Sequence, residues 1–173
     1  MLTGKKIVLG VSGGIAAYKM ANVASMLSKL HADIHVVMTE NATHFITPET
    51  FEVLTGNHCY TDTFDRCMEL HVPHIALGTQ ADAILIAPAS ADVVGKIANG
   101  IADDMLTTCV LPATCPVMLA PSMNVHMYEN PIVQDNMKKL ASYGYEIIEA
   151  DEGYLACRDI GKGKLPPEHV LVD

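Results

Sequence analysis

The chain has 173 residues, and half of them are hydrophobic, which predicts one folded domain with a sizeable core and excludes intrinsic disorder. Its apolar runs are too short to cross a bilayer, and a net charge of −9 without a basic cluster argues against nucleic acid or an anionic membrane as a partner. Because the N-terminus lacks the features of a signal peptide and the five cysteines form no Cys-x-x-Cys pair, we expect a cytoplasmic protein with free thiols.

Strands and helices are predicted to alternate along the chain. Apolar runs predict strands at 7–11, 34–38, 82–87, 117–120 and, shorter, 146–149. Helical spacing and terminal signals predict helices at 15–30, 74–80, 92–99, 103–111 and 130–144, and a further helix start at Thr47-Pro48-Glu49. Residues 56–73 show no periodicity and predict a loop. This order implies an α/β fold of the Rossmann or flavodoxin-like type, with three layers in which helices cover both faces of a parallel sheet.

A glycine-rich turn follows the first predicted strand, at Gly10-Val11-Ser12-Gly13-Gly14. Glycines at this position let backbone N–H groups approach a phosphate at the N-terminus of a helix, although such a turn is also typical of tight packing. The second strand ends at Thr39 and lacks the acidic residue that binds a dinucleotide ribose. Thr39 therefore favours a mononucleotide phosphate or a flavin hydroxyl.

Two further strands run into small, polar loops at 88–92 and 121–128. In an open parallel sheet, such loops meet at the carboxyl edge, where ligands bind. Small side chains in the first loop permit a planar ring to approach, and Ser90 either donates to a ligand or caps the next helix. The Asn124 amide can hold a carboxylate without a positive charge, which favours decarboxylation because a cation would stabilise the carboxylate ground state. An Asx turn that starts a helix is the alternative.

Two other residues carry side chains suited to proton transfer. His74 follows Pro73 at a predicted helix start, where the helix dipole disfavours the imidazolium, so we expect a neutral ring; a capping histidine is the alternative. His71 and His74 have no third ligand at metal spacing, and we expect no metal site. Cys157 lies in a glycine-rich segment that is typical of a flap over a substrate, from which a thiol can deliver a proton. An ordinary surface loop is the alternative.

Taken together, these segments resemble the homo-oligomeric flavin-containing cysteine decarboxylases, a family that includes the phosphopantothenoylcysteine decarboxylases. The resemblance spans nearly the whole chain and is most specific at Pro121-Ser122-Met123-Asn124, at Met127 and at Ala156-Cys157. It implies a single flavoprotein domain over residues 1–173. In some members this domain is the N-terminal part of a bifunctional protein that also contains phosphopantothenate–cysteine ligase.

The resemblance implies FMN as the cofactor, held between the subunits of a homotrimer that can assemble further into a dodecamer. The residues matched to FMN contacts are Ser12, Gly13, Gly14, Thr39, Ser90, Ala91 and Asp92. Three residues are matched to catalytic roles: His74 beside flavin and substrate, Asn124 at the substrate carboxylate, and Cys157 as the proton donor. The residues matched to substrate binding are Asn124, Met127 and Ala156.

The implied reaction converts 4′-phosphopantothenoylcysteine to 4′-phosphopantetheine in coenzyme A biosynthesis, through thiol oxidation, loss of CO2 and re-reduction of the enethiol. The ligase is an expected partner, fused or separate. The alternative is a peptidyl-cysteine decarboxylase, whose reaction stops at the enethiol. Arg158 stands where the family usually has glycine, and this difference could indicate another substrate, so the alternative is retained. Two other possibilities are less favoured, because a flavin prenyltransferase needs a basic cluster and a non-enzymatic regulatory subunit tends to carry an acidic tail.

Overall fold

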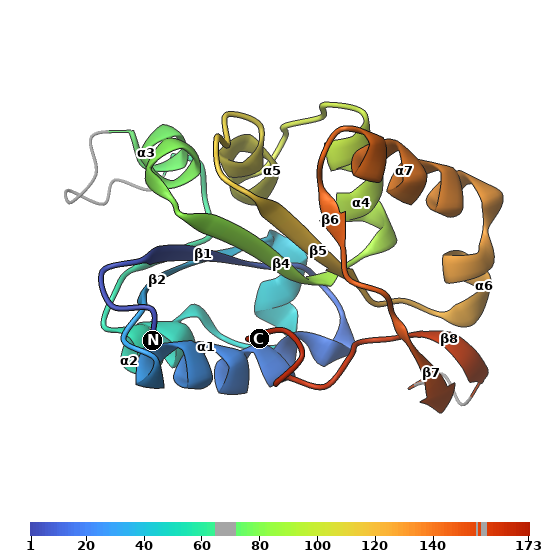
Figure 1. The fold of residues 1–173 in the computed structure, drawn as a ribbon, viewed down its shortest axis with the longest axis horizontal. Coiled ribbons are helices and arrows are strands. Elements are labelled where there is room, and N and C mark those ends of the chain that lie inside the picture. Colours follow the sequence, from blue (N-terminus) through green and yellow to red (C-terminus); the bar gives the residue numbers. More distant parts are fainter. Residues whose placement is uncertain (65–71, 155, 157–158) are drawn as a thin grey trace.

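A six-stranded parallel sheet forms the centre of the computed structural model, which describes residues 1–64, 72–154, 156 and 159–173 (Figure 1). The strand order is β3-β2-β1-β4-β5-β6. The strands are β1 (Lys6–Val11), β2 (Asp33–Met38), β3 (Cys59–Tyr60), β4 (Ala83–Ala89), β5 (Val117–Pro121) and β6 (Glu146–Ile147). The predicted parallel sheet is therefore confirmed. One strand, β3, falls in the stretch predicted as a loop, because two residues are too few to show a periodicity.

Helices cover both faces of this sheet, as predicted (Figure 1). One face is covered by α1 (Met20–Lys29) and α2 (Pro48–Thr55), together with the 3-10 helices η1 (Ile15–Lys19) and η2 (Glu40–His44). The other face is covered by α3 (Pro73–Gln80), α4 (Ala91–Ala98), α5 (Met105–Val110) and α7 (Pro131–Ser142). Alternate strand residues pack on opposite faces, so that Val8 lies in one core and Leu9 in the other. This two-sided burial explains why the strands read as continuous apolar runs.

Several predicted element bounds change in the structure. The predicted helix at 15–30 begins as η1 and only then continues as α1. The predicted helix at 103–111 shortens to α5 because Asp104 caps its N-terminus, where its side chain accepts from the Thr107 N–H. A short helix, α6 (Val125–Glu129), follows Asn124.

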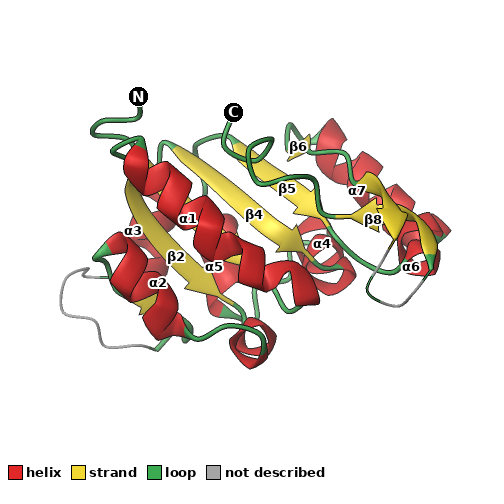
Figure 2. Ribbon diagram, turned by 90° about the horizontal axis from the view of Figure 1, so that it is seen from below, coloured by secondary structure: helices red, strands yellow, loops and turns green. Residues whose placement is uncertain are grey.

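The glycine-rich segment predicted as a flap contains part of a two-stranded antiparallel hairpin, formed by β7 (Asp151–Tyr154) and β8 (Ile160–Lys164). This hairpin lies beside α6, at the opposite end of the molecule from α3 (Figures 1 and 2). After β8 the chain returns to the α1 side of the sheet, where Leu165 and Leu171 are buried. Within the described ranges, no helix has the length and apolar character needed to cross a membrane.

Candidate functional site

The site lies at the carboxyl edge of the sheet, where the chain leaves β1, β4 and β5. Strand β1 pairs with β2 on one side and with β4 on the other, so the strand order reverses here. In doubly wound sheets, ligands bind in the crevice at such a reversal. Two cavities, of about 280 Å³ and 460 Å³, open at this edge. Both are lined by Gly13, Ser90, Ala91 and Met127, so they adjoin each other.

The two cavities differ in chemistry. The smaller one is lined mainly by glycine, alanine and apolar side chains, including Gly14, Met123 and Met127, and Asn124 and Ala156 also face it. The larger one is polar, and Thr39, Asp92 and Lys96 are among its lining residues. A flat apolar slot next to a polar recess fits a ligand with a planar ring at one end and a polar chain at the other. The structure thus brings together nine of the sequence-predicted residues: Gly13, Gly14, Thr39, Ser90, Ala91, Asp92, Asn124, Met127 and Ala156.

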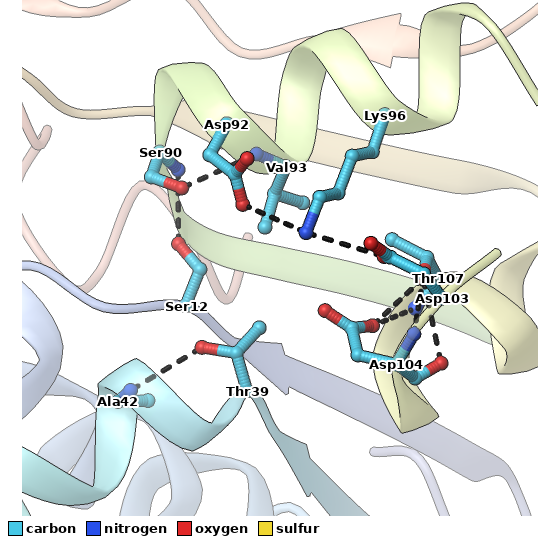
Figure 3. A network of polar contacts seen from close by, with 10 residues as sticks. All are labelled: Ser12, Thr39, Ala42, Ser90, Asp92, Val93, Lys96, Asp103, Asp104 and Thr107. Carbon is cyan, nitrogen blue, oxygen red and sulfur yellow. Dashed lines mark hydrogen bonds and ion pairs between the residues drawn. The ribbon is translucent and has the colours of Figure 1, made fainter. Parts of the chain in front are cut away.

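Ser12 joins the first two loops of this site. Its hydroxyl is fully buried and donates to the Pro88 carbonyl at 2.6 Å. It also accepts from the Ser90 N–H at 2.9 Å (Figure 3). Ser12 lines neither cavity. Its hydroxyl thus fixes the distance between the glycine turn and the β4 loop, and its contact with a cofactor stays a prediction.

Gly13 is required by the packing of the turn. A Cβ added at this residue would lie 2.5 Å from the Asn41 Cβ in η2 and 3.0 Å from the Asn41 backbone carbon. Real Cβ atoms essentially never approach so closely, so any side chain would push the turn away from η2. The glycine turn is therefore both tightly packed and part of a cavity wall. Tight packing and ligand binding, the two interpretations of this sequence, are compatible.

Thr39 and Ser90 are helix caps that also face the larger cavity. The Thr39 hydroxyl accepts from the Ala42 N–H at 3.2 Å, and the Ser90 hydroxyl accepts from the Val93 N–H at 3.3 Å (Figure 3). A hydroxyl that accepts one bond still carries a proton that it can donate to a ligand. Capping and ligand binding are therefore compatible at both positions.

Lys96 forms an ion-pair network in the larger cavity. Its ammonium lies 3.2 Å from an oxygen of Asp92, one helical turn earlier, and 3.2 Å from an oxygen of Asp103 (Figure 3). Burial lowers the pKa of Lys96, but hydrogen bonds to Asp103 and Asp92 outweigh this effect and raise the pKa above its ordinary value. Lys96 therefore stays charged near neutral pH, although sequence analysis did not single it out.

Asn124 occupies the junction between the β5 loop and α6. Its Oδ1 accepts from the His126 N–H at 2.8 Å, which is the Asx turn that was the alternative interpretation of this residue, and its Nδ2 donates to Asp159 Oδ2 at 3.0 Å. The amide also lines the smaller cavity. Sequence analysis missed Asp159; its position two residues after Cys157 was the available signal.

The β7–β8 hairpin packs closely on the β5 loop. The Met123 N–H donates to the Gly163 carbonyl at 3.0 Å. A Cβ on Gly161 would lie 2.6 Å from Val125 Cγ2, and one on Gly163 would lie 2.4 Å from the Met123 carbonyl oxygen. Glycine at these two positions therefore permits the hairpin to form one wall of the smaller cavity.

Of the two other predicted catalytic residues, His74 lies apart from this cluster within one chain, and Cys157 is outside the described residues. His74 is the second residue of α3 and lines neither cavity, and its buried Nδ1 has no hydrogen-bond partner among the described residues. Cys157 and Arg158 lie outside the described residues, as does His71. Burial raises the pKa of Cys59 and of Cys109 to about 12, so neither thiol is suited to proton transfer near neutral pH.

The described ranges contain no group of three His, Cys, Asp or Glu side chains that is placed to hold a metal ion. The hydroxyls, amides and backbone N–H groups described above suit an organic ligand that carries oxygen-rich groups.

Comparison with known proteins identifies relatives along the whole chain. The chain is 49% identical over 172 residues to the coenzyme A biosynthesis bifunctional protein CoaBC of Bacillus subtilis. The aligned region covers 99% of this chain and 42% of that protein. It is 44% identical over 163 residues to the probable phosphopantothenoylcysteine decarboxylase of Streptococcus mutans, covering 93% of this chain and 91% of that protein. The chain thus spans about two fifths of its bifunctional relatives and nearly all of the shorter one.

Solved structures share the fold. The FMN-dependent cysteine decarboxylase SpaF superposes with a TM-score of 0.85 at 35% identity, covering 99% of this chain and 98% of that one. A PPC decarboxylase mutant complexed with pantothenoylaminoethenethiol superposes with a TM-score of 0.87 at 29% identity, covering 96% and 93%. The model of the family described as "Flavoprotein" matches residues 1–173, and the chain therefore belongs to the flavoprotein family.

Proposed function

We propose that this chain binds FMN and decarboxylates 4′-phosphopantothenoylcysteine to 4′-phosphopantetheine in coenzyme A biosynthesis. The observation that carries the proposal is the smaller cavity, a mainly apolar space lined by the loops after β1, β4 and β5, with Asn124 among its lining residues. The name of the S. mutans relative supports this substrate, the name of the B. subtilis relative supports a role in coenzyme A biosynthesis, and the name of SpaF supports FMN as the form of the flavin.

The residues at the carboxyl edge fit such a cofactor. Gly13 and Gly14 leave the cavity wall without side chains, so that a ring can lie against the backbone. The Thr39 and Ser90 hydroxyls and the first-turn N–H groups of α4, at Ala91 and Asp92, would hold the polar chain and its phosphate. When bound, the flavin supplies the two-electron oxidation of the thiol-bearing carbon that makes the neighbouring carboxylate a leaving group.

The chain's own residues bind the substrate and exclude water from it. The Asn124 amide holds the substrate carboxylate by a neutral hydrogen bond, so the carboxylate is not stabilised by a full positive charge. Met127 and Ala156 contact the apolar part of the substrate from α6 and from the hairpin side. Cys157 would deliver the proton in the last reduction, while the hydride would come from the flavin that the thiol oxidation had reduced, so that proton and hydride together give the saturated thiol product.

His74 completes the site from another subunit in this proposal. In one chain, α3 lies at the far end of the molecule from the hairpin and from α6 (Figures 1 and 2). The exposed apolar side chains on either side of His74, Val72 and Ile75, are features of a surface that a second copy covers. A homotrimer, or a dodecamer built from trimers, would place His74 of one subunit beside the cavity of the next.

The test is the spectrum of the purified protein and the mass of its product. We expect visible flavin absorption, release of FMN on denaturation, and a product from 4′-phosphopantothenoylcysteine that is lighter by one CO2. A folded protein that takes up no flavin would refute the proposal. The alternative function would give a product from a peptide with a C-terminal cysteine that is lighter by CO2 and two hydrogens.

A cysteine variant tests the final step in the same assay. Cys157→Ser is expected to release CO2 and to accumulate the enethiol, because the proton donor is lost while the oxidation is retained. Cys115→Ser is the matched control, since Cys115 precedes β5 and lines neither cavity of the site. Saturated product from Cys157→Ser would remove Cys157 from the mechanism.

A further inference from the structure

Lys96 lines the larger cavity and lies between carboxylates from two different segments. Its side chain is only 24% exposed, and its ammonium is 3.2 Å from an oxygen of Asp92 and 3.2 Å from an oxygen of Asp103 (Figure 3). Asp92 belongs to the first turn of α4, whereas Asp103 belongs to the loop between α4 and α5. An ammonium has three N–H donors, so these two contacts leave a third donor for a ligand in the cavity.

The charges around the larger cavity make Lys96 important for any anion that enters it. Of the lining residues that the structure describes, four carry carboxylates and Lys96 is the one cation. The carboxylates are those of Glu40, Asp92, Asp103 and Asp104. They repel a bound anion, and in a partly buried site this repulsion is stronger than in water. The Lys96 ammonium offsets the repulsion because it carries the opposite charge within the same cavity.

Lys96 also affects the N-terminal end of α4. The Ala91 and Asp92 N–H groups have no acceptor within the helix and are suited to an anion. The Asp92 carboxylate lies in the same turn, so it repels an anion that approaches these N–H groups. Its contact with Lys96, one turn further along α4, holds it toward the helix interior and partly neutralises it. The first turn of α4 is thereby left to the ligand.

From this arrangement we propose that Lys96 determines which flavin the chain selects, because it makes the larger cavity accept a phosphate. This role rests on the proposed function, in which the flavin ring lies in the smaller cavity and the phosphate-bearing chain lies in the adjoining larger one. FMN and riboflavin share the ring and the hydroxylated chain, and they differ only in the terminal phosphate. Lys96 therefore stabilises bound FMN and contributes little to bound riboflavin.

The test is a competition between FMN and riboflavin for the same protein. The purified, flavin-loaded protein is equilibrated with known amounts of both flavins, and the bound flavins are then separated and quantified. The result is a ratio of two dissociation constants, and it counts only molecules that hold a flavin. A substitution that merely loosens the fold lowers both affinities and leaves this ratio unchanged, so the ratio reports recognition of the phosphate.

Lys96→Met keeps most of the length of the side chain and removes its charge. We expect it to reduce the preference for FMN over riboflavin by about tenfold, the size of one charge contact in a partly buried site. Lys96→Arg keeps the charge, so its preference should stay within about twofold of the wild type. Lys138→Met is the matched control, because Lys138 also pairs with an aspartate, Asp135, but both side chains are exposed on α7 and line neither cavity.

Asp103→Asn makes the opposite change in charge. It removes one negative charge from the cavity and keeps a side-chain oxygen that can accept from Lys96. We expect the preference for FMN to rise by about threefold, a smaller effect because Asp103 is 56% exposed and water screens its charge. A gain of FMN preference in this variant cannot come from a loosened fold, so it separates charge from structure.

Four results would overturn the role of Lys96. They are an unchanged flavin ratio in Lys96→Met, an equal loss of preference in Lys96→Arg, a wild type without preference for FMN, and an unchanged ratio in Asp103→Asn where Lys96→Met does not fold. If the wild type binds flavin and decarboxylates the substrate while one of these results is found, only the role of Lys96 fails. A folded wild type that takes up neither flavin refutes the proposed function and this inference together.

Discussion

At the scale of single residues, the Ser12 hydroxyl is the contact on which the geometry of the site depends most directly. Ser12→Ala leaves the Ser90 N–H without its acceptor, while the Pro88 carbonyl keeps the Ser12 N–H as a donor. A buried donor that loses its partner costs about 1–3 kcal/mol. We expect the melting temperature to fall by roughly 2–4 °C per kcal/mol lost, with weaker flavin binding, measured by thermal denaturation and flavin titration.

Ser142→Ala is the matched control for this substitution. The Ser142 hydroxyl also donates to a backbone carbonyl, that of Lys139, but Ser142 is exposed at the end of α7. Water can replace that bond, so we expect little change in stability. Equal melting temperatures for the two variants would show that the buried bond of Ser12 contributes no stability of its own.

At the scale of elements, the site depends on the docking of the β7–β8 hairpin on the β5 loop. Gly163 has a φ of +137°, and an added Cβ would lie 2.4 Å from the Met123 carbonyl oxygen. Gly163→Ala therefore combines backbone strain of roughly 1–3 kcal/mol with a steric clash. We expect faster proteolysis within the hairpin and loss of decarboxylation, whereas the flavin still binds, because the loops after β1 and β4 are unchanged.

Gly100→Ala separates strain from clash. Gly100 also has a positive φ, of +68°, but an added Cβ would meet no atom within 4 Å. This variant should lose some stability and keep both the hairpin and the activity. If Gly163→Ala behaves in the same way as Gly100→Ala, close packing against Met123 is not what holds the hairpin.

At the scale of the whole molecule, the separation of His74 from the cavity predicts that subunits complement each other. His74→Asn and Asn124→Asp are each expected to be inactive alone. Co-expressed, they should form mixed oligomers in which about a quarter of the shared sites have both wild-type residues, and activity should return to that fraction. Activity is measured as CO2 release after co-purification on two different tags. Mixed oligomers without activity would place both residues of one site in one chain.

Most of the fold and most of the cavity could be predicted from the chain. Buried parallel strands are apolar on both faces, so 7–11, 34–38, 82–87 and 117–120 are visible as runs without any knowledge of their partners. Their carboxyl ends must meet at one edge, and so Gly13, Thr39, Ser90 and Asn124 could be assigned to one site. Strand β3 could not be predicted from the sequence, because its two residues form a strand only by pairing with β2.

The sequence by itself determined the order of elements, the loops that carry polar residues and the resemblance to flavin-containing decarboxylases, because these depend on local pattern and motif. Only the tertiary structure decided that the Ser12 hydroxyl is buried between two loops, that Asp159 reaches an amide 35 residues away, and that His74 lies apart from the cavity of its own chain. Each of these depends on contacts between segments that are distant in sequence, and residue periodicity carries no information about such contacts.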